Sequence, residues 1–497
     1  MRKGITNMKQ YWKQVLSILL AMLMLSSLLL SCAEQPDDNK GETTTADSSG
    51  KSEETTDGAQ DSLPQLDFKG AEVNIIGYLE SDLAPKTTDS ADVLADAMYN
   101  RDRYVEERLN VKIIGHLIDD YDALNTSVDN AVTGGADTYQ VAYAQMVFGT
   151  SALAMKGRLM NLYDLQYYNS SSPWWDKNVD RAFQIGDTLY MTAGDILPAN
   201  MMISACIAFN KKKMTDSGME FPYQMAKNGE WTIDQMIAMT KDRTKDLNGD
   251  GDMSTDDDFY GFVSWHLDSP FNFFYGSGCT VFTKDEDNMP VFSANAQKIE
   301  DVYSKVYELF ITNESYYEKD VAVHDKPFEV FTDGRALFAA LSLSTVSRTE
   351  FKDMSDKFGV LPQPKYEVSD EYLSFVNGSA DMVCVPMSVN DADMVGATLE
   401  ALGSASYSMV TDVLREKVCK AKNVNDEESA EMVDIIFRHR VYDFGYVHFF
   451  PLGHSAAIMF QTALDKGSSS VGTLVSRCND RALKKNLEEF LKSYSKK

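Results

Sequence analysis

Apolar and polar residues follow two regular patterns in the first third of the chain, and together these patterns predict strands joined by helices. Strand-like apolar runs cover Val73–Tyr78, Val111–Ile118 and Tyr139–Gln145. Residues 92–110 and 121–132, which lie between these runs, carry apolar positions at helical spacing. Strands that alternate with helices are typical of a parallel α/β sheet.

Candidate ligand residues follow from this sheet, because ligands of parallel sheets bind beyond the carboxyl ends of the strands. The rule points to Tyr78 and Glu80 after the first strand. It also points to Tyr143 and Gln145 at the end of the third strand. The alternative at each position is an ordinary loop residue.

The segment Gly186–Met214 holds two more strand-like runs, separated by a break of Gly, Asp, Pro and Asn. Thr188–Thr192 alternates polar and apolar residues, and Met201–Phe209 is apolar and long enough for one buried strand. We interpret the segment as a crossover between two lobes. Asp195, in its break, is a further ligand candidate.

Several short motifs follow in a fixed order along the rest of the chain. They are Asn-Lys-Lys from Asn210, a Trp-Thr helix start at Trp231 with Thr232 as cap, F-x-x-G-x-A-x-F from Phe331, a strand and Pro turn over Phe358–Pro364, and the run Asn377–Pro386. This series, with the crossover, resembles bacterial extracellular solute-binding proteins of the sugar-binding type (family 1), the capture components of ABC importers. The resemblance spans about Val73 to Tyr494.

The resemblance implies an α/β protein with the two-lobe, type II periplasmic-binding-protein-like fold and a hinge. A small-molecule ligand, expected to be a carbohydrate, would bind between the lobes and close them. The closed form would dock on an ABC importer permease, and neither covalent chemistry nor a required cofactor is implied. A monomer is expected. Ser342, Ser344 and Asn377 fall where that family places cleft residues.

The implied domain boundaries are discontinuous along the chain. A signal peptide covers residues 1–31, and a linker covers residues 32–65. The first lobe is expected to comprise residues 66–194 with 343–385, and the second residues 195–342 with 386–497.

Aromatic residues with neighbouring polar groups supply the remaining ligand candidates. Trp265 and Asp268 follow a short strand, and carbohydrate recognition needs an apolar ring face beside a hydroxyl-binding carboxylate. Tyr446 and Phe449 precede the break at Pro451 and are candidates for closing the cleft. Core packing is the alternative for these aromatic residues.

The stretch DLNGDGDMSTDD matches the spacing of a calcium loop, with Gly251 at the sharp turn. The candidate ligands are Asp246, Asn248, Asp250, Asp252 and Asp257. Position 12 carries the shorter Asp257 where Glu normally provides a bidentate ligand. The sequence therefore predicts a possible structural Ca²⁺, with a solvated acidic loop as the alternative.

The N-terminus and the charge indicate where the protein works. A cationic start precedes an apolar run over Val15–Leu30, which is short for a transmembrane helix and is typical of a signal peptide. Leu29–Cys32 resembles a bacterial lipobox, so Cys32 would be lipidated and hold the body at the extracytoplasmic face of the cell membrane. The polar linker cannot bury enough apolar surface to fold. With 75 Asp and Glu against 47 Lys and Arg, the chain repels nucleic acid and anionic lipid, so contact with the membrane is expected through the anchor only.

Catalytic signatures do not occur in the sequence. The chain contains no phosphate-binding loop, no dinucleotide-binding glycine motif, no H-E-x-x-H and no complete G-x-S-x-G. We therefore expect a binding protein without enzymatic activity. The alternatives are a secreted glycoside-active enzyme, and a binding protein for a peptide or another polar solute.

Overall fold

A computed structural model gives the structure of the protein, and it describes most of the chain. The described residues are 60–78, 82–84, 87, 92–419, 427–453, 458–478 and 481–494. The predicted signal peptide, Cys32 and Glu80 lie outside these residues. The described parts of residues 59–319 and 325–497 form one compact body, and the turn η5 (Val321–Val323) belongs to a separate small unit.

The first sheet has four strands in the order β12-β3-β1-β2. Their bounds are β1 (Ala71–Gly77), β2 (Val111–Leu117), β3 (Val141–Gln145) and β12 (Asp381–Cys384). β1 runs parallel to β2 and β3, and β12 runs antiparallel to β3. The parallel sheet predicted from the alternating pattern is confirmed.

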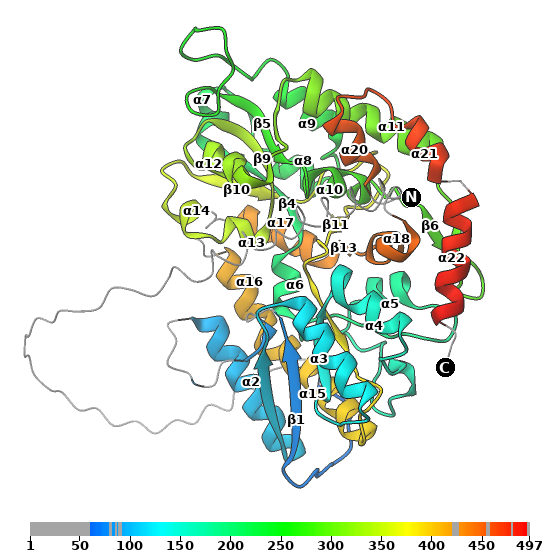
Figure 1. Ribbon diagram of the computed structural model, residues 1–497. Helices are drawn as coiled ribbons and strands as arrows, with labels where there is room; N and C mark the ends of the chain where they lie inside the picture. Colours follow the sequence, from blue (N-terminus) through cyan, green and yellow to red (C-terminus); the bar gives the residue numbers. More distant parts are fainter. Residues whose placement is uncertain are drawn as a thin grey trace, which may run out of the picture. The chain divides into compact units, whose positions relative to one another are not determined.

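Two capped helices connect the parallel strands. Asp92 caps α2 (Val93–Leu109) through the amide of Leu94, and Asp120 caps α3 (Tyr121–Thr133) through the amide of Ala123. Crossovers between parallel strands are right-handed, and the two connections run in opposite directions along the sheet, so α2 and α3 lie on opposite faces (Figure 1). Val105 and Leu109 of α2 belong to the same buried core as Val73 of β1.

The second sheet has five strands in the order β10-β4-β9-β5-β8. Their bounds are β4 (Ala205–Asn210), β5 (Tyr260–Trp265), β8 (Tyr316–Glu318), β9 (Ala336–Ser342) and β10 (Phe358–Leu361). β5 is parallel to β8 and β9, whereas β4 is antiparallel to both of its neighbours. Two small sheets complete the strands: β6 (Phe282–Lys284) with β7 (Pro290–Phe292), and β11 (Ser374–Phe375) with β13 (Arg440–Val441).

Helices surround both sheets. Those of the first lobe are η2 (Met146–Thr150), α4 (Ser151–Met155), α15 (Ala392–Met409) and α16 (Thr411–Cys419). The segment between α4 and the crossover adds η3 (Leu162–Asp164) and α5 (Lys177–Phe183). Those of the second lobe are α7 (Lys211–Asp216), α8 (Tyr223–Lys227), α9 (Ile233–Thr240), α10 (Ser269–Gly276), α11 (Ala296–Tyr307), η4 (Glu308–Thr312), α12 (Lys326–Thr332), α13 (Leu343–Val346), α14 (Thr349–Asp353), α17 (Glu427–Arg438), α20 (Met459–Asp465) and α21 (Gly472–Cys478). In the part of the chain that the structure describes, no helix has the length and apolar content needed to cross a bilayer.

Several contacts join segments that the expected boundaries would separate, and the lobe boundaries stay a prediction. Within residues 343–385, β10 pairs with β4 in the second sheet, because its apolar side chains complete that core. α15 packs along α2 of the first lobe, although residues 386–497 were expected in the second (Figure 1). The C-terminal helices α18 (Phe444–Val447), α19 (Phe449–Leu452) and α22 (Arg481–Tyr494) form a group that contacts η2 and α4. The linker ends earlier than expected, since Asp61 forms an ion pair with Arg108 of α2.

The crossover is also more irregular than predicted. The expected strand Met201–Phe209 begins instead as the short helix α6 (Pro198–Met202), which β4 follows. Pro198 stands at the first helical position, where its fixed φ favours a helix start. Thr188–Thr192 forms no regular strand, and Thr192 makes only an isolated bridge to Val383.

The two crossing segments lie side by side at the hinge. Ser204 bridges Val376, as Thr192 bridges Val383. Between these bridges the Asn200 amide donates to the carbonyl of Asp381 at 2.7 Å, and its oxygen accepts from the Asp381 amide at 3.1 Å. Asn200 is buried, so its one side chain forms hydrogen bonds with two backbone groups that water does not reach.

We therefore predict that Asn200→Ala lowers the free energy of unfolding by about 1–3 kcal/mol, because the backbone amide and carbonyl of Asp381 lose their hydrogen-bond partners. Urea denaturation measures the change. The control Asn228→Ala, at an exposed amide in a turn, should cost less than about 0.5 kcal/mol. Equal effects of the two substitutions would contradict the hinge role of Asn200.

Candidate functional site

The structure brings together four of the predicted ligand residues. The Asn377 amide donates to the carboxylate of Asp268, which immediately precedes α10. Gly378 donates its amide to the hydroxyl of Tyr446 at 3.4 Å, and the ring of Tyr446 stacks with Phe449 at a centroid distance of 6.2 Å. Asp268, Asn377, Tyr446 and Phe449 therefore form one group, which we call the Asp268 group.

Close packing holds this group in place. A Cβ atom on Gly378 would lie 2.4 Å from Val147 Cγ2 and 2.9 Å from Tyr446 Cε1, so only glycine fits between them. Burial raises the pKa of Tyr446, and the charge of Asp268 raises it further. Tyr446 therefore stays protonated and can donate a hydrogen bond, while Asp268 and Asn377 supply acceptor and donor groups.

A second set of predicted residues lies at the carboxyl edge of the first sheet. Tyr78 follows β1 and is half-buried, and burial raises its pKa, as do the nearby charges of Asp381, Asp120 and Asp119. Gln145 ends β3 opposite Asp381 and is buried. Tyr143 lies two residues earlier and is buried as well.

The remaining predicted residues lie elsewhere. Trp265 ends β5 and is buried, with its backbone amide donating to Ser269 Oγ at 3.2 Å. Ser342 caps α13 and lies 2.8 Å from the hydroxyl of Ser344. Asp195 is buried in the field of Arg440, which itself pairs with Asp176 at 2.9 Å. Burial raises the pKa of Asp195 to about 6, although the charge of Arg440 lowers it, and ligand binding by Asp195 stays a prediction.

A buried polar cluster beside the hinge contains residues that the sequence did not single out. Asp82 Oδ1 accepts from the amide of Ala199 in α6 at 2.8 Å. Arg101 of α2 binds Asp102 at 2.8 Å and reaches the carbonyl of Ile196 at 3.4 Å. In the described part of the chain Asp82 Oδ2, the Tyr143 hydroxyl and Gln145 Oε1 have no hydrogen-bond partner, so this cluster has unused polar capacity.

Burial also raises the pKa of Asp82 to about 7, although the Ala199 amide and the Arg101 charge lower it. Its ordinary value is 3.8, so the folded protein holds this proton more tightly than the unfolded chain. Protonated Asp82 therefore stabilises the folded protein. This stabilisation is fully present below the pKa of the unfolded chain, 3.8, and is lost as the pH rises through the pKa in the folded protein, about 7.

We predict that Asp82→Asn removes this loss, since the neutral amide oxygen still accepts from Ala199. The difference in melting temperature between the variant and the wild type should increase, in favour of the variant, by several degrees from about pH 5 to about pH 8. Asp287→Asn, at an exposed position, should show no such trend. A difference for Asp82→Asn that does not change with pH would contradict the assignment.

The calcium-like loop has a tight turn but no converged cation site. Gly249 and Gly251 adopt φ values of 77° and 87°, and their amides donate to Asp246 at 2.6 and 2.8 Å. The Asn248 amide donates to Asp250 and Asp257, and Asp252 donates its backbone amide to Asp250. Among the described residues no set of three or more His, Cys, Asp or Glu side chains is arranged to hold a metal ion. Calcium binding at this loop stays a prediction.

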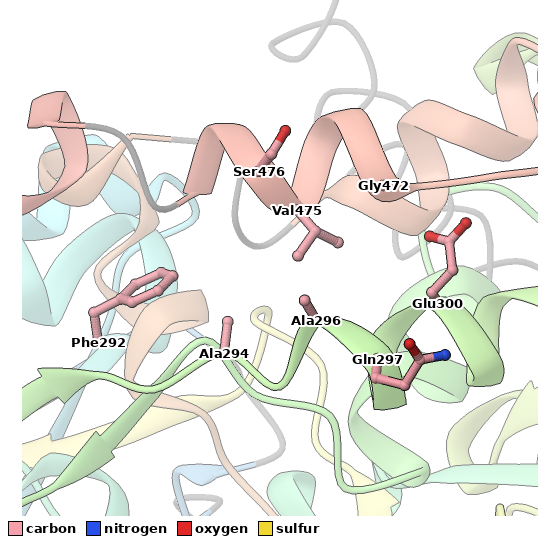
Figure 2. Close-up of a pocket in the computed structure, with 8 residues that line it drawn as sticks. All are labelled: Phe292, Ala294, Ala296, Gln297, Glu300, Gly472, Val475 and Ser476. Atoms are coloured by element: carbon pink, nitrogen blue, oxygen red, sulfur yellow. The ribbon is translucent and has the colours of Figure 1, made fainter.

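A surface pocket of about 320 Å³ lies between β7, α11 and α21 (Figure 2). Val475 of α21 points toward Ala296 of α11 across it, with Phe292 at one end and Glu300 at the other. None of the predicted ligand residues lines this pocket. Its lining is mainly small and apolar, so we assign the candidate site to the Asp268 group and the edge of the first sheet.

The fold is that of the solute-binding proteins of ABC transporters, with two α/β lobes. No family profile matches the chain, and no curated protein matches it in sequence.

Three solved structures illustrate the likeness. The cyclic alpha-maltosyl-1,6-maltose binding protein of Arthrobacter globiformis is 16% identical with a TM-score of 0.56, over 84% of this chain and 99% of that one. The GacH receptor of Streptomyces glaucescens is 14% identical with a TM-score of 0.52, over 84% and 99%. An ABC substrate-binding protein of Listeria monocytogenes in complex with cycloalternan is 13% identical with a TM-score of 0.50, over 86% and 100%.

Proposed function

We propose that the protein is a solute-binding protein that captures a carbohydrate and delivers it to the permease of an ABC importer. The Asp268 group carries the proposal. A carboxylate and an amide that can bind sugar hydroxyls lie beside two half-buried aromatic rings that can cover apolar sugar faces. These groups come from the residue before α10, from the segment before β12 and from the C-terminal helices, so a ligand here would contact several segments that meet near the hinge.

The ligands of proteins with the same fold support a carbohydrate over a peptide. The Arthrobacter protein binds cyclic alpha-maltosyl-1,6-maltose, the Streptomyces receptor was solved with acarbose, and the Listeria protein holds cycloalternan. Two of these proteins are described as binding proteins and the third as a receptor, which favours capture without turnover for this chain.

The proposal extends to the place of action. The apolar N-terminal run and Leu29–Cys32 favour export and lipidation at Cys32. The polar linker would then tether a monomeric body at the extracytoplasmic face of the membrane. The formal net charge of −28 opposes binding to nucleic acid and to anionic lipid surfaces.

We predict that at least one member of a panel of mono- and oligosaccharides raises the melting temperature of the protein. A ligand at about 100 times its Kd stabilises the folded state by about 2.7 kcal/mol.

Asp268→Asn should weaken the binding of that saccharide by about tenfold or more in calorimetry, because a charged acceptor is lost. Asp287→Asn is the matched control and should bind like the wild type.

Two results would contradict the proposed function. One is the lack of any thermal shift across the panel at millimolar saccharide. The other is catalytic release of a chromophore from aryl glycosides at a rate that Asp268→Asn abolishes, which would favour the glycoside-active enzyme.

A further inference from the structure

Six aromatic rings form a continuous row through the candidate site. The successive pairs are Tyr78–Tyr121, Tyr121–Phe148, Phe148–Phe450, Phe450–Phe449 and Phe449–Tyr446. Their centroids lie 6.0, 5.2, 5.3, 4.1 and 6.2 Å apart, which is the range of direct ring contact. We call these six residues the aromatic row.

The row follows the edge of the first sheet and then leaves it. Tyr78, Tyr121 and Phe148 come from the segments that follow β1, β2 and β3, so three successive strand ends present one ring each. Phe450 and Phe449 belong to α19, and Tyr446 belongs to α18. Tyr446 in turn contacts Phe271 of α10 at 5.5 Å. The row therefore leads from the first sheet to a helix of the second lobe.

The exposure of the row differs from that of core aromatic residues. Tyr78, Phe148, Phe449, Phe450 and Tyr446 are only half-buried, and Tyr121 is 7% exposed. Core rings such as Phe262, Phe273 and Phe310 are completely buried. A row in which five of six rings are half-buried, along the edge where ligands of parallel sheets bind, is unlike the packing of a core.

Polar groups accompany both ends of the row. Burial raises the pKa of the Tyr78 hydroxyl, and the negative charges of Asp381, Asp120 and Asp119 raise it further. At the other end, Asp268 and its partner Asn377 lie beside Tyr446. Ring faces with carboxylates at both ends match the chemistry of a ligand that repeats an apolar face and a set of hydroxyl groups.

We propose that the ligand is an oligosaccharide of at least three sugar units that lies along the aromatic row. This inference rests on the proposed function and assigns ligand contact to Tyr121, Phe148 and Phe450. A monosaccharide offers one ring and can cover only one or two of the six aromatic rings. A chain of sugars can contact successive rings, so its affinity should grow with its length.

Isothermal titration calorimetry of the full-length protein tests the proposal. The probes are homologous series of α-glucan, β-glucan, β-mannan and β-xylan saccharides, each from the monosaccharide to the pentasaccharide. In the series that binds, the trisaccharide should bind at least about tenfold more tightly than the monosaccharide, since each covered ring adds contact.

Phe148→Leu and Phe450→Leu test the residues themselves. Leucine keeps apolar volume but removes the flat ring face, so both variants should fold, and melting curves check this. Each should weaken the trisaccharide or a longer saccharide by about tenfold. Phe328→Leu in α12, which is also half-buried but lies outside the row, should bind like the wild type.

The outcomes separate this inference from the proposed function. A monosaccharide that binds as tightly as its trisaccharide, or ring variants that bind like the wild type, would overturn the oligosaccharide assignment and leave carbohydrate binding intact. The lack of binding by every saccharide of every length would overturn both.

Discussion

The side-chain amide of Asn200 hydrogen-bonds both backbone groups of Asp381, and the two crossing segments depend on this contact. Asn200 lies in α6, two residues before the end of the helix that leads into β4 of the second sheet. Asp381 begins β12 of the first sheet and faces Gln145 at the end of β3. One buried side chain therefore fixes where a strand of each sheet begins. The same contact lies beside Gln145 at the edge of the first sheet.

Charge is buried close to this hinge, and it comes from residues far apart in the sequence. Asp82 caps α6 through Ala199, and Arg101 of α2 reaches the carbonyl of Ile196 in the crossover. Burial disfavours the charged form of a carboxyl group, and it raises the pKa of Asp82 to about 7. The hinge segments are thus held by polar groups whose geometry is specific, whereas the sheets on either side are held by apolar packing.

Local periodicity was sufficient to predict the strands and connecting helices at the start of the first sheet. The expected strands Val73–Tyr78, Val111–Ile118 and Tyr139–Gln145 correspond to β1, β2 and β3, and Thr232 caps α9 as predicted. Prediction failed where long-range contacts decide. β10 joins the second sheet because β4 offers it an edge, and α15 returns to α2, although no local pattern marks either choice.

The candidate site was predictable only in part, for a physical reason. The rule for parallel sheets identified Tyr78, and the aromatic and polar composition identified Asp268, Tyr446 and Phe449. The same rule applied after β2 points to Tyr121, but its position at the start of a helix concealed it. Phe148 and Phe450 meet across 302 positions of sequence, a contact of 5.3 Å that no local pattern encodes. Asp195 was selected by its place in the crossover, and its burial beside Arg440 depends on β13, far along the chain.

On this proposal, a ligand held at the hinge draws the two lobes together. Small-angle X-ray scattering with and without a bound saccharide tests this directly. Calorimetry first establishes the saccharide concentration that saturates the protein. The saturated protein should have a smaller radius of gyration, because a ligand that contacts both lobes shifts the population toward the closed form. Scattering curves that superimpose at saturation would contradict it.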